Sequence, residues 1–344
     1  MNLFLFLSGL LIMLLTLFDL VYTIFAPRGA GIISGKVTSA VSYIFKALYQ
    51  LTKNKNIYNG QGVAIVVSIE LVWVMLLWLS NMIIFISDPQ AVVDSTTHQA
   101  ATSLERFYYT GYLLTTMGNG DYIGGTDLWK VYAALISFTG LLMITLSISY
   151  MVPVLSAVTE RRALSIRIAS IGHGPQAMLV NNWNGQDFSM LNGQLQELAQ
   201  SIAKQGQLHF SYPVLHFFHH SQKETALLPN LVAFDEAITI LLLYVPKEYR
   251  PAEQYLIPVR LAISSFLETL TATFIKASDE LPPIFNLDKI RDLNVPLCVP
   301  SQNKIAELDL RRRILCAMME NGGWHWEDLD APLFNKKLEL SSLN

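Results

Sequence analysis

Three kinds of feature are scarce in this sequence, and each absence excludes a class of protein. The two cysteines, Cys298 and Cys316, stand apart and form no C-x-x-C motif, so we expect neither a disulfide framework nor a zinc site. The net charge of −3 offers no strongly basic surface for nucleic acid. No nucleophile–base pair and no phosphate loop stands out, so we predict no enzyme and no cofactor.

The common regulatory devices of membrane proteins are missing as well. The sequence Ile-Gly-His-Gly-Pro at residues 171–175 has neither the spacing nor the context of a nucleotide-binding G-x-G-x-x-G motif. No segment repeats arginine at every third position, which excludes a voltage sensor of that type. A β-rich pattern typical of a cyclic-nucleotide domain is also absent.

Apolar residues are abundant by contrast. They make up 52% of the 344 residues, with a mean hydropathy of +0.36, and they concentrate in the first 160 positions. Residues 3–25, 63–86 and about 128–158 are long enough to cross a bilayer. The first run has no basic start and no clear cleavage site, which favours a helix over a secretory signal peptide. We expect a multi-pass protein of the plasma (inner) membrane.

Charge sets the expected orientation of these spans. The loop between the first two spans has no acidic residue, but it carries Arg28, Lys36, Lys46, Lys53 and Lys55. The segment from 87 to 127 is acidic, and the third span returns to a basic cluster at residues 161–167. By the positive-inside rule, the N-terminus is outside and the C-terminal half is cytoplasmic.

The first loop contains apolar residues at helical spacing, namely Val37, Val41, Ile44, Leu48 and Leu51. This pattern predicts an amphipathic helix within a first region, residues 1–60. The helix lies on the inner leaflet of the membrane or packs on the cytoplasmic domain, and the pattern fits both.

Residues 115–121 read Thr-Thr-Met-Gly-Asn-Gly-Asp between a short apolar–aromatic segment, about 103–114, and the third span. A desolvated cation needs several oxygen ligands in place of water, and successive backbone carbonyls can supply them. Gly118 and Gly120 permit the φ angles that aim neighbouring carbonyls toward one side. The hydroxyl of Thr116 can add another oxygen. This loop therefore predicts a cation site.

The order of half-length helix, Thr-x-Gly-x-Gly-Asp loop and full-length helix resembles the pore loop of the potassium-channel superfamily, of the two-transmembrane type. The resemblance implies an all-α membrane fold with a re-entrant pore helix, within a pore domain at residues 61–160. It implies ion binding at Thr116, Met117, Gly118, Asn119 and Gly120, with support from Thr115 and Asp121. One loop supplies a quarter of a coordinating ring, so a homotetramer is expected.

Two positions depart from the usual Thr-Val/Ile-Gly-Tyr/Phe-Gly pattern of that superfamily. Met117 replaces the β-branched residue, and Asn119 replaces the aromatic residue that packs against the pore helix. Asn119 either substitutes hydrogen bonds to a tyrosine of the pore helix (Tyr108, Tyr109 or Tyr112) or leaves a softer filter. The first alternative favours potassium selectivity, and the second favours a pore that admits both sodium and potassium.

Gly140 lies about where the superfamily carries a hinge glycine in the inner helix, and Pro153 can bend the same helix near its inner end. The resemblance implies a gating hinge at these two positions. Alternatively, Gly140 only lets two helices approach closely.

Asp19 and Glu70 are carboxylates within expected spans, a third of the way in from the cytoplasmic side. Such residues suggest proton sensing or an ion vestibule. Because neither lies on the helix after the filter, we favour a structural role, with Tyr, Ser or Thr hydroxyls or loop lysines as partners.

Residues 161–344 have the composition of a soluble domain. Helical patterns at 188–204, 230–245, 252–277 and 301–320, separated by glycine and proline breakers, predict an all-α cytoplasmic bundle. His216 and His220 are four positions apart and are expected to share a helix face, which would make them candidate metal ligands. Without a cysteine or paired carboxylate nearby, core or interface histidines are favoured over a metal site.

The sequence thus predicts a homotetrameric cation channel that conducts potassium, or a weakly selective channel for sodium and potassium. A third hypothesis is a non-conducting, membrane-anchored sensor or scaffold, whose helical domain binds an unknown ligand or protein. The expected partners are the bilayer and copies of the same chain, but not nucleic acid.

Overall fold

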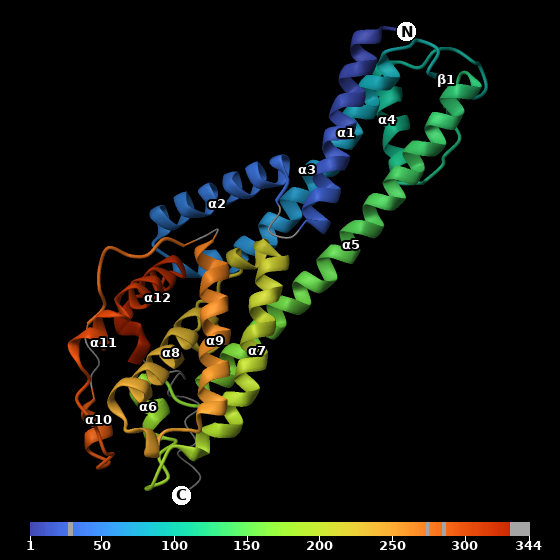
Figure 1. The fold of residues 1–344 in the computed structure, drawn as a ribbon. Coiled ribbons are helices and arrows are strands. Elements are labelled where there is room, and N and C mark those ends of the chain that lie inside the picture. The colour runs from blue at the N-terminus through green and yellow to red at the C-terminus, as the bar shows by residue number, and fades with distance from the viewer. Residues whose placement is uncertain (27–29, 273–274, 284–286, 331–344) are drawn as a thin grey trace, which may run out of the picture. The chain divides into compact units, whose positions relative to one another are not determined.

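The computed structural model describes the chain except for residues 27–29, 273–274, 284–286 and 331–344, so Arg28 lies outside the described residues. Contacts divide the chain into two units. The first, which we call the pore unit, comprises residues 1–48 and 63–155. The second, the C-terminal unit, comprises residues 49–62 and 156–344. Both are built almost entirely of helices (Figure 1), which confirms the predicted fold class.

The pore unit contains the expected spans, and two of them match the predicted bounds closely. Its elements are α1 (Leu3–Phe25), α2 (Ile32–Thr52), α3 (Gln61–Ile86), β1 (Val92–Asp94), α4 (Ser103–Leu114), β2 (Tyr122–Gly124) and α5 (Asp127–Ala169). Helix α2 and the start of α3 extend into residues assigned to the C-terminal unit, as does the end of α5. The inner helix, expected at about 128–158, continues to Ala169.

Large apolar side chains remain exposed along the spans. On α1, Phe4, Leu11 and Phe18 recur at intervals of seven and are 78%, 58% and 63% exposed. Helices α1, α3 and α5 are all long and apolar enough to cross a membrane. Such a surface is stable in lipid, where no water penalises apolar exposure.

Small residues let the helices of this unit approach one another. A Cβ atom built at Gly9 of α1 would lie 2.7 Å from the carbonyl oxygen of Ser80 on α3. Membrane helices associate through such contacts because lipid provides no hydrophobic drive between them. The core around the α3–α4 contact consists of aromatic and aliphatic side chains, including Trp73, Phe85 and Tyr109.

The secondary-structure elements in the described part of the C-terminal unit are all helices. Its α-helices after α5 are α6 (Pro175–Val180), α7 (Asn192–Ser211), α8 (Leu227–Tyr244), α9 (Glu253–Thr271), α10 (Asp288–Arg291), α11 (Gln302–Ala306) and α12 (Asp309–Asn321). Short 3-10 helices occur at Lys55–Gly60, Ser189–Leu191, Pro213–Phe217, Lys223–Thr225, Lys247–Tyr249 and Trp326–Asp330. Helices α7 and α9 pack side by side (Figure 1).

Helix α8 is the centre of this unit and is a fourth segment apolar enough to span a membrane. However, 89% of its apolar window is buried inside the unit. It contacts α6, α9 and α12, and a helix enclosed on all sides is apolar on all sides. Burial within the C-terminal unit therefore accounts for its composition.

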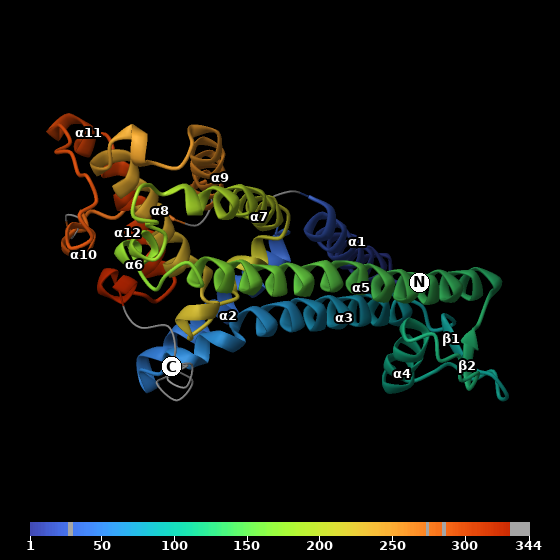
Figure 2. The ribbon, with the colours of Figure 1, turned by 90° about the horizontal axis from the view of Figure 1, so that it is seen from below.

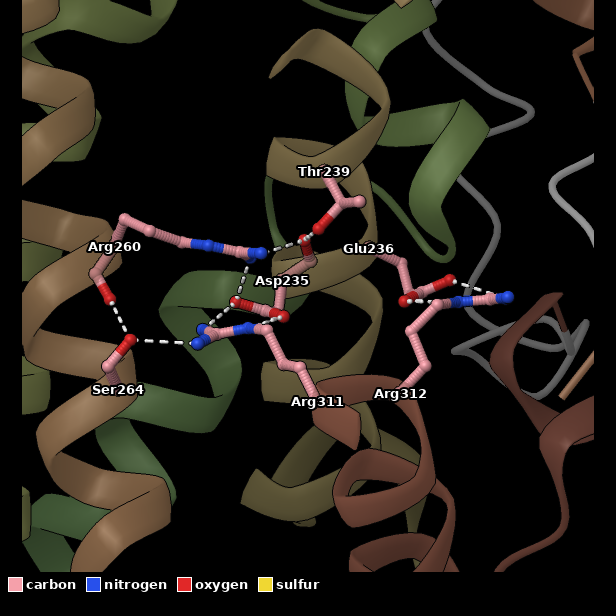
Figure 3. A network of polar contacts seen from close by, with 7 residues as sticks. All are labelled: Asp235, Glu236, Thr239, Arg260, Ser264, Arg311 and Arg312. Atoms are coloured by element: carbon pink, nitrogen blue, oxygen red, sulfur yellow. Dashed lines mark hydrogen bonds and ion pairs between the residues drawn. The ribbon is translucent and has the colours of Figure 1, made fainter. Parts of the chain in front are cut away.

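Two adjacent carboxylates of α8 are nevertheless buried. Asp235 receives ion pairs of 2.6 Å from both Arg260 of α9 and Arg311 of α12. Glu236 pairs with Arg312 at 3.2 Å. Figure 3 shows these residues, which we call the α8 charge network, joining three helices. Every carboxylate and guanidinium in the network has a partner, as buried charges require.

Candidate pore loop

The loop at 115–121 begins at the end of a well-capped short helix. Thr102 accepts a hydrogen bond from the backbone N–H of Glu105, and the Glu105 carboxylate accepts one from the backbone N–H of Thr102 at 2.7 Å. This capping box fixes the start of α4. The helix ends at Leu114, as predicted, and its carbonyl end leads directly into the loop.

Backbone conformation alternates along the loop. Thr116, Gly118 and Gly120 have positive φ angles of 57°, 60° and 85°, and Met117 and Asn119 between them do not. Residues of alternating hand rotate successive peptide planes, so that neighbouring carbonyls can face the same side. The positive φ at the two glycines was expected, but that at Thr116 was not, because non-glycine residues rarely adopt it.

Neither glycine is required for space. A Cβ atom built on Gly118 or Gly120 meets no atom of the described part of this chain within 4 Å. These positions therefore need glycine for conformation alone, since other L-residues are strained at positive φ.

The first half of the loop is anchored to the last turn of α4. The N–H of Thr116 donates to the carbonyl of Leu113 at 3.0 Å, and the N–H of Met117 donates to that of Tyr112 at 2.9 Å. The hydroxyl of Thr115 donates to the carbonyl of Gly111 at 3.0 Å. These bonds add partners to carbonyls in the last turn of the helix, where free carbonyls occur.

The second half is held by side chains. Asn119 Nδ2 donates to the hydroxyl of Tyr108 and, at 2.8 Å, to Oδ2 of Asp121. Tyr108 in turn donates to the same Asp121 oxygen at 3.3 Å. We call these three residues the Asn119 triangle. Of the three tyrosines considered from sequence, Tyr108 is the one that bonds to Asn119, and Tyr112 instead donates to the carbonyl of Tyr122.

A two-stranded antiparallel sheet follows the loop and was not predicted. Strands β1 and β2 pair Val92 with Gly124 and Asp94 with Tyr122, beside α4 (Figure 2). The N–H of Ser95 extends the pairing to the carbonyl of Asp121 at 2.9 Å. The sheet thus holds the exit of the loop. Strands of three residues carry too little alternation to be found in a sequence.

Arg106 is a second residue whose role sequence reasoning missed. It is 6% exposed and donates to the backbone carbonyls of Phe85, Asp88, Pro89 and Ala101. It therefore ties α4 to the segment that follows α3. The only available signal was a single arginine in an acidic stretch.

Gly140 of α5 lies against the end of α4. A Cβ atom built at Gly140 would be 2.0 Å from the carbonyl oxygen of Leu114. A close approach therefore accounts for this glycine. Pro153 lies within α5, which remains one helix from Asp127 to Ala169. A gating role for the two residues stays a prediction.

Asp19 joins three helices. It is 2% exposed and accepts hydrogen bonds from the N–H groups of Ile33 and Ser34 in the first turn of α2, at 2.7 and 3.1 Å, and from Trp73 Nε1 at 2.9 Å. Its observed partners are thus backbone amides and an indole, not the expected hydroxyls or lysines. A carboxylate at a helix N-terminus satisfies free amides and complements the helix dipole.

Glu70 does have a hydroxyl partner of the expected kind. It accepts a hydrogen bond from Ser147 Oγ at 2.6 Å, which links α3 to α5. This contact is compatible with the structural role that the sequence favours.

The two candidate metal ligands do not share a helix face, so that expectation is wrong. His216 lies in the 3-10 helix Pro213–Phe217, and His220 lies beyond its end. Pro213 opens this 3-10 helix, which ends at Phe217, so the segment does not form the α-helix that the spacing requires. Among the described residues, no group of three or more His, Cys, Asp or Glu could hold a metal.

Comparison with known proteins agrees with the pore geometry. The sequence model of an ion channel family matches residues 71–157, from within α3 through α4 and the loop into α5. The chain therefore contains an ion channel domain, which is not an enzyme. The matched region starts at residue 71, upstream of the short helix at about 103–114 where the resemblance begins. It leaves α1 and α2 outside.

One curated relative covers nearly the whole chain. It is the uncharacterized membrane protein YdjJ of Bacillus subtilis (strain 168), 27% identical over 323 residues, which are 93% of this chain and 94% of the relative. No solved structure matches the chain. The protein is a multi-pass membrane protein, and its C-terminal unit lies outside the matched channel family.

Proposed function

We propose that the protein is a homotetrameric channel that conducts potassium through a filter made by residues 116–120. The observation that carries this proposal is the alternation of positive φ at Thr116, Gly118 and Gly120. It is the backbone geometry that a carbonyl ladder requires. The ion channel family match over residues 71–157 supports the same function.

In this proposal, Thr115 and Asp121 support the filter, and α5 is the inner helix, with Gly140 and Pro153 as positions of bending. The N-terminus is outside the plasma membrane and the C-terminal unit is cytoplasmic, by the distribution of lysine and arginine. The proposed functional domains are residues 1–60 with the first span and the basic segment, residues 61–160 with the pore, and residues 161–344 with the cytoplasmic helices.

The Asn119 triangle supports potassium selectivity, because hydrogen bonds replace the packing of the missing aromatic residue. A single specific observation favours the weakly selective alternative. The side chain of Asn119 is exposed, and its hydrogen-bond partners among the described residues are Tyr108 and Asp121. It therefore restrains the ring less than buried aromatic packing does.

The test is cation flux through the purified protein in liposomes. We expect potassium flux in the wild type, and loss of flux in Gly118→Ala and Gly120→Ala, because an L-residue at positive φ costs roughly 1–2 kcal/mol at each position in every subunit. The matched control is Gly185→Ala. Gly185 has a φ of +91° and no atom within 4 Å of a built Cβ, but it lies in the C-terminal unit.

Equal potassium and sodium flux in the wild type, with a higher preference for potassium in Asn119→Tyr, would establish the weakly selective channel. No flux of any cation from a folded, membrane-inserted protein would favour the non-conducting sensor or scaffold. Normal flux in both glycine variants would overturn the assignment of the filter.

A further inference from the structure

The C-terminal unit handles its buried charges in two different ways. In the α8 charge network, the three arginines each pair with Asp235 or Glu236 (Figure 3). Arg161, near the end of α5, is equally buried, with 4% exposure. Yet no carboxylate of the described residues lies within ion-pair distance of it. The adjacent Glu160 pairs with Lys204 instead, at 2.8 Å.

Two nitrogen atoms of the Arg161 guanidinium differ in their contacts. Nη1 donates to the backbone carbonyl of Leu215. Nε is buried, and no described residue accepts a hydrogen bond from it. Nε and Nη2 form the side-on edge of the guanidinium, which binds the two oxygens of a carboxylate or phosphate together.

Arg161 lines a small hollow on the C-terminal unit. The hollow is lined by Arg161, Phe218, His219, His220 and Trp324, among others. His220 Nε2 is also buried without a partner in the described part of the chain. The residues that carry these two unpartnered atoms, Arg161 and His220, therefore line the same hollow. Buried polar groups of this kind normally have a partner, and a bound molecule can supply it.

The electrostatics of the hollow favour an anion. Burial lowers the pKa of Arg161 to about 10, so the group remains a cation at neutral pH. Burial and the charge of Arg161 lower the pKa of His219 and of His220 to about 4, so both imidazoles are neutral there. A neutral imidazole still offers one N–H donor. The hollow therefore combines one positive charge with neutral donors.

We propose that Arg161, His219 and His220 form a binding site for a small anionic ligand, whose carboxylate or phosphate group takes the free edge of Arg161. The ligand would supply Arg161 with the negative charge that Asp235 and Glu236 supply to the arginines of the α8 charge network. The proposal concerns binding to the C-terminal unit and does not depend on whether the protein conducts ions.

The test is isothermal titration of the full-length protein in detergent, with inorganic phosphate and acetate as separate probes at matched ionic strength. Binding of phosphate alone indicates a phosphate group, and binding of acetate indicates a carboxylate. Arg161→Gln, which keeps an amide donor for Leu215, should weaken binding at least about tenfold because it removes a charge-assisted pair.

The matched control is Arg162→Gln, which removes the same charge from the next residue, an exposed one. It should bind both probes as the wild type does. His220→Ala should weaken binding several-fold without abolishing it. The melting temperature of each variant, measured without anion, shows that it is folded.

Three results would overturn the proposal. The wild type binds neither probe, which leaves the hollow to water. A folded Arg161→Gln variant binds as well as the wild type. Or Arg162→Gln weakens binding as much as Arg161→Gln, which means that the anion responds to surface charge and not to this hollow.

Discussion

The pore loop and the α8 charge network are both polar sites, but they are built from different parts of the chain. In the loop, the important groups belong to the backbone, and their placement follows from the φ angles of Thr116, Gly118 and Gly120. In the network, the important groups are side chains, and Asp235 at its centre is fully buried.

The difference predicts what each site tolerates. A backbone site is sensitive to substitutions that change conformation, even where the described chain leaves space, as it does at Gly118 and Gly120. A buried side-chain site is sensitive to any change in the balance of charge. Substitutions should therefore separate conduction from stability, and the predictions below test that separation.

The largest effect is expected for Asp235→Ala. It leaves Arg260 and Arg311 buried without a countercharge, and breaking a buried ion pair in this way costs about 3–5 kcal/mol. The melting temperature should fall sharply, and peptides from α8 and α9 should lose protection against hydrogen exchange. Peptides from α3 and α4 should be protected as in the wild type.

The control for this variant is Glu253→Gln. Its partner is Lys247, in an ion pair whose side chains are 67% and 78% exposed, so removal should not change the melting temperature measurably. If Asp235→Ala and Glu253→Gln melt alike, the α8 charge network is not what stabilises the unit.

Sequence reasoning succeeded where one physical signal dominates a whole segment. The apolar run at residues 3–25 gave the bounds of α1, because lipid requires an uninterrupted apolar helix of that length. The aromatic half-helix at 103–114 gave α4 for a similar reason, since the Thr-Thr-Met-Gly-Asn-Gly-Asp loop marks its end. The two glycines of the loop also predicted the positive φ angles found at their positions.

Features that depend on contacts between residues distant in the sequence were not predicted. Strand β2 is defined by pairing with β1, about thirty positions earlier, and neither strand carries a pattern of its own. Arg161 was counted only as a positive charge on the cytoplasmic side. Its burial without a carboxylate follows from the packing of the C-terminal unit, which no local pattern encodes.

The second-largest effect is expected from acid, which should destabilise the C-terminal unit more than the pore unit. Burial, followed by the charges of His219 and Arg161, lowers the pKa of His216 to about 3, and the pKa values of His219 and His220 are about 4. Unfolded histidines titrate near pH 6.5. Between these values the unfolded chain binds protons that the folded unit does not, so stability is present above about pH 6.5 and is lost as the pH falls toward 4.

Unfolding of the C-terminal unit should therefore become easier by at least about 1.4 kcal/mol, the value of one pKa unit, between pH 6.5 and pH 5. Hydrogen exchange at the two pH values, corrected for intrinsic rates, measures this in α7 peptides. The variant His219→Gln/His220→Gln should flatten the dependence, and His98→Asn, at an exposed position in the pore unit, should not. Equal acid sensitivity in α3 peptides would contradict the assignment to the histidines.

The smallest effect is expected where the backbone site does use side chains, at the Asn119 triangle. Tyr108→Phe removes the hydroxyl that accepts from Asn119 and donates to Asp121, but it keeps the ring. Asn119 keeps its hydrogen bond to Asp121, and the bond that it loses to Tyr108 is worth about 1 kcal/mol. If the triangle holds the filter at a fixed radius, the ratio of potassium to sodium flux in liposomes should fall roughly fivefold, the equivalent of that energy.

Total potassium flux and the melting temperature should stay near the wild-type values in Tyr108→Phe, because the positive-φ backbone is untouched. Tyr43→Phe, at a tyrosine of α2 that is 73% exposed, is the matched control and should leave selectivity unchanged. Unchanged selectivity in Tyr108→Phe would mean that the backbone anchors to Leu113 and Tyr112 suffice to hold the loop. The pore loop would then be a purely backbone-built site, and its contrast with the α8 charge network would be complete.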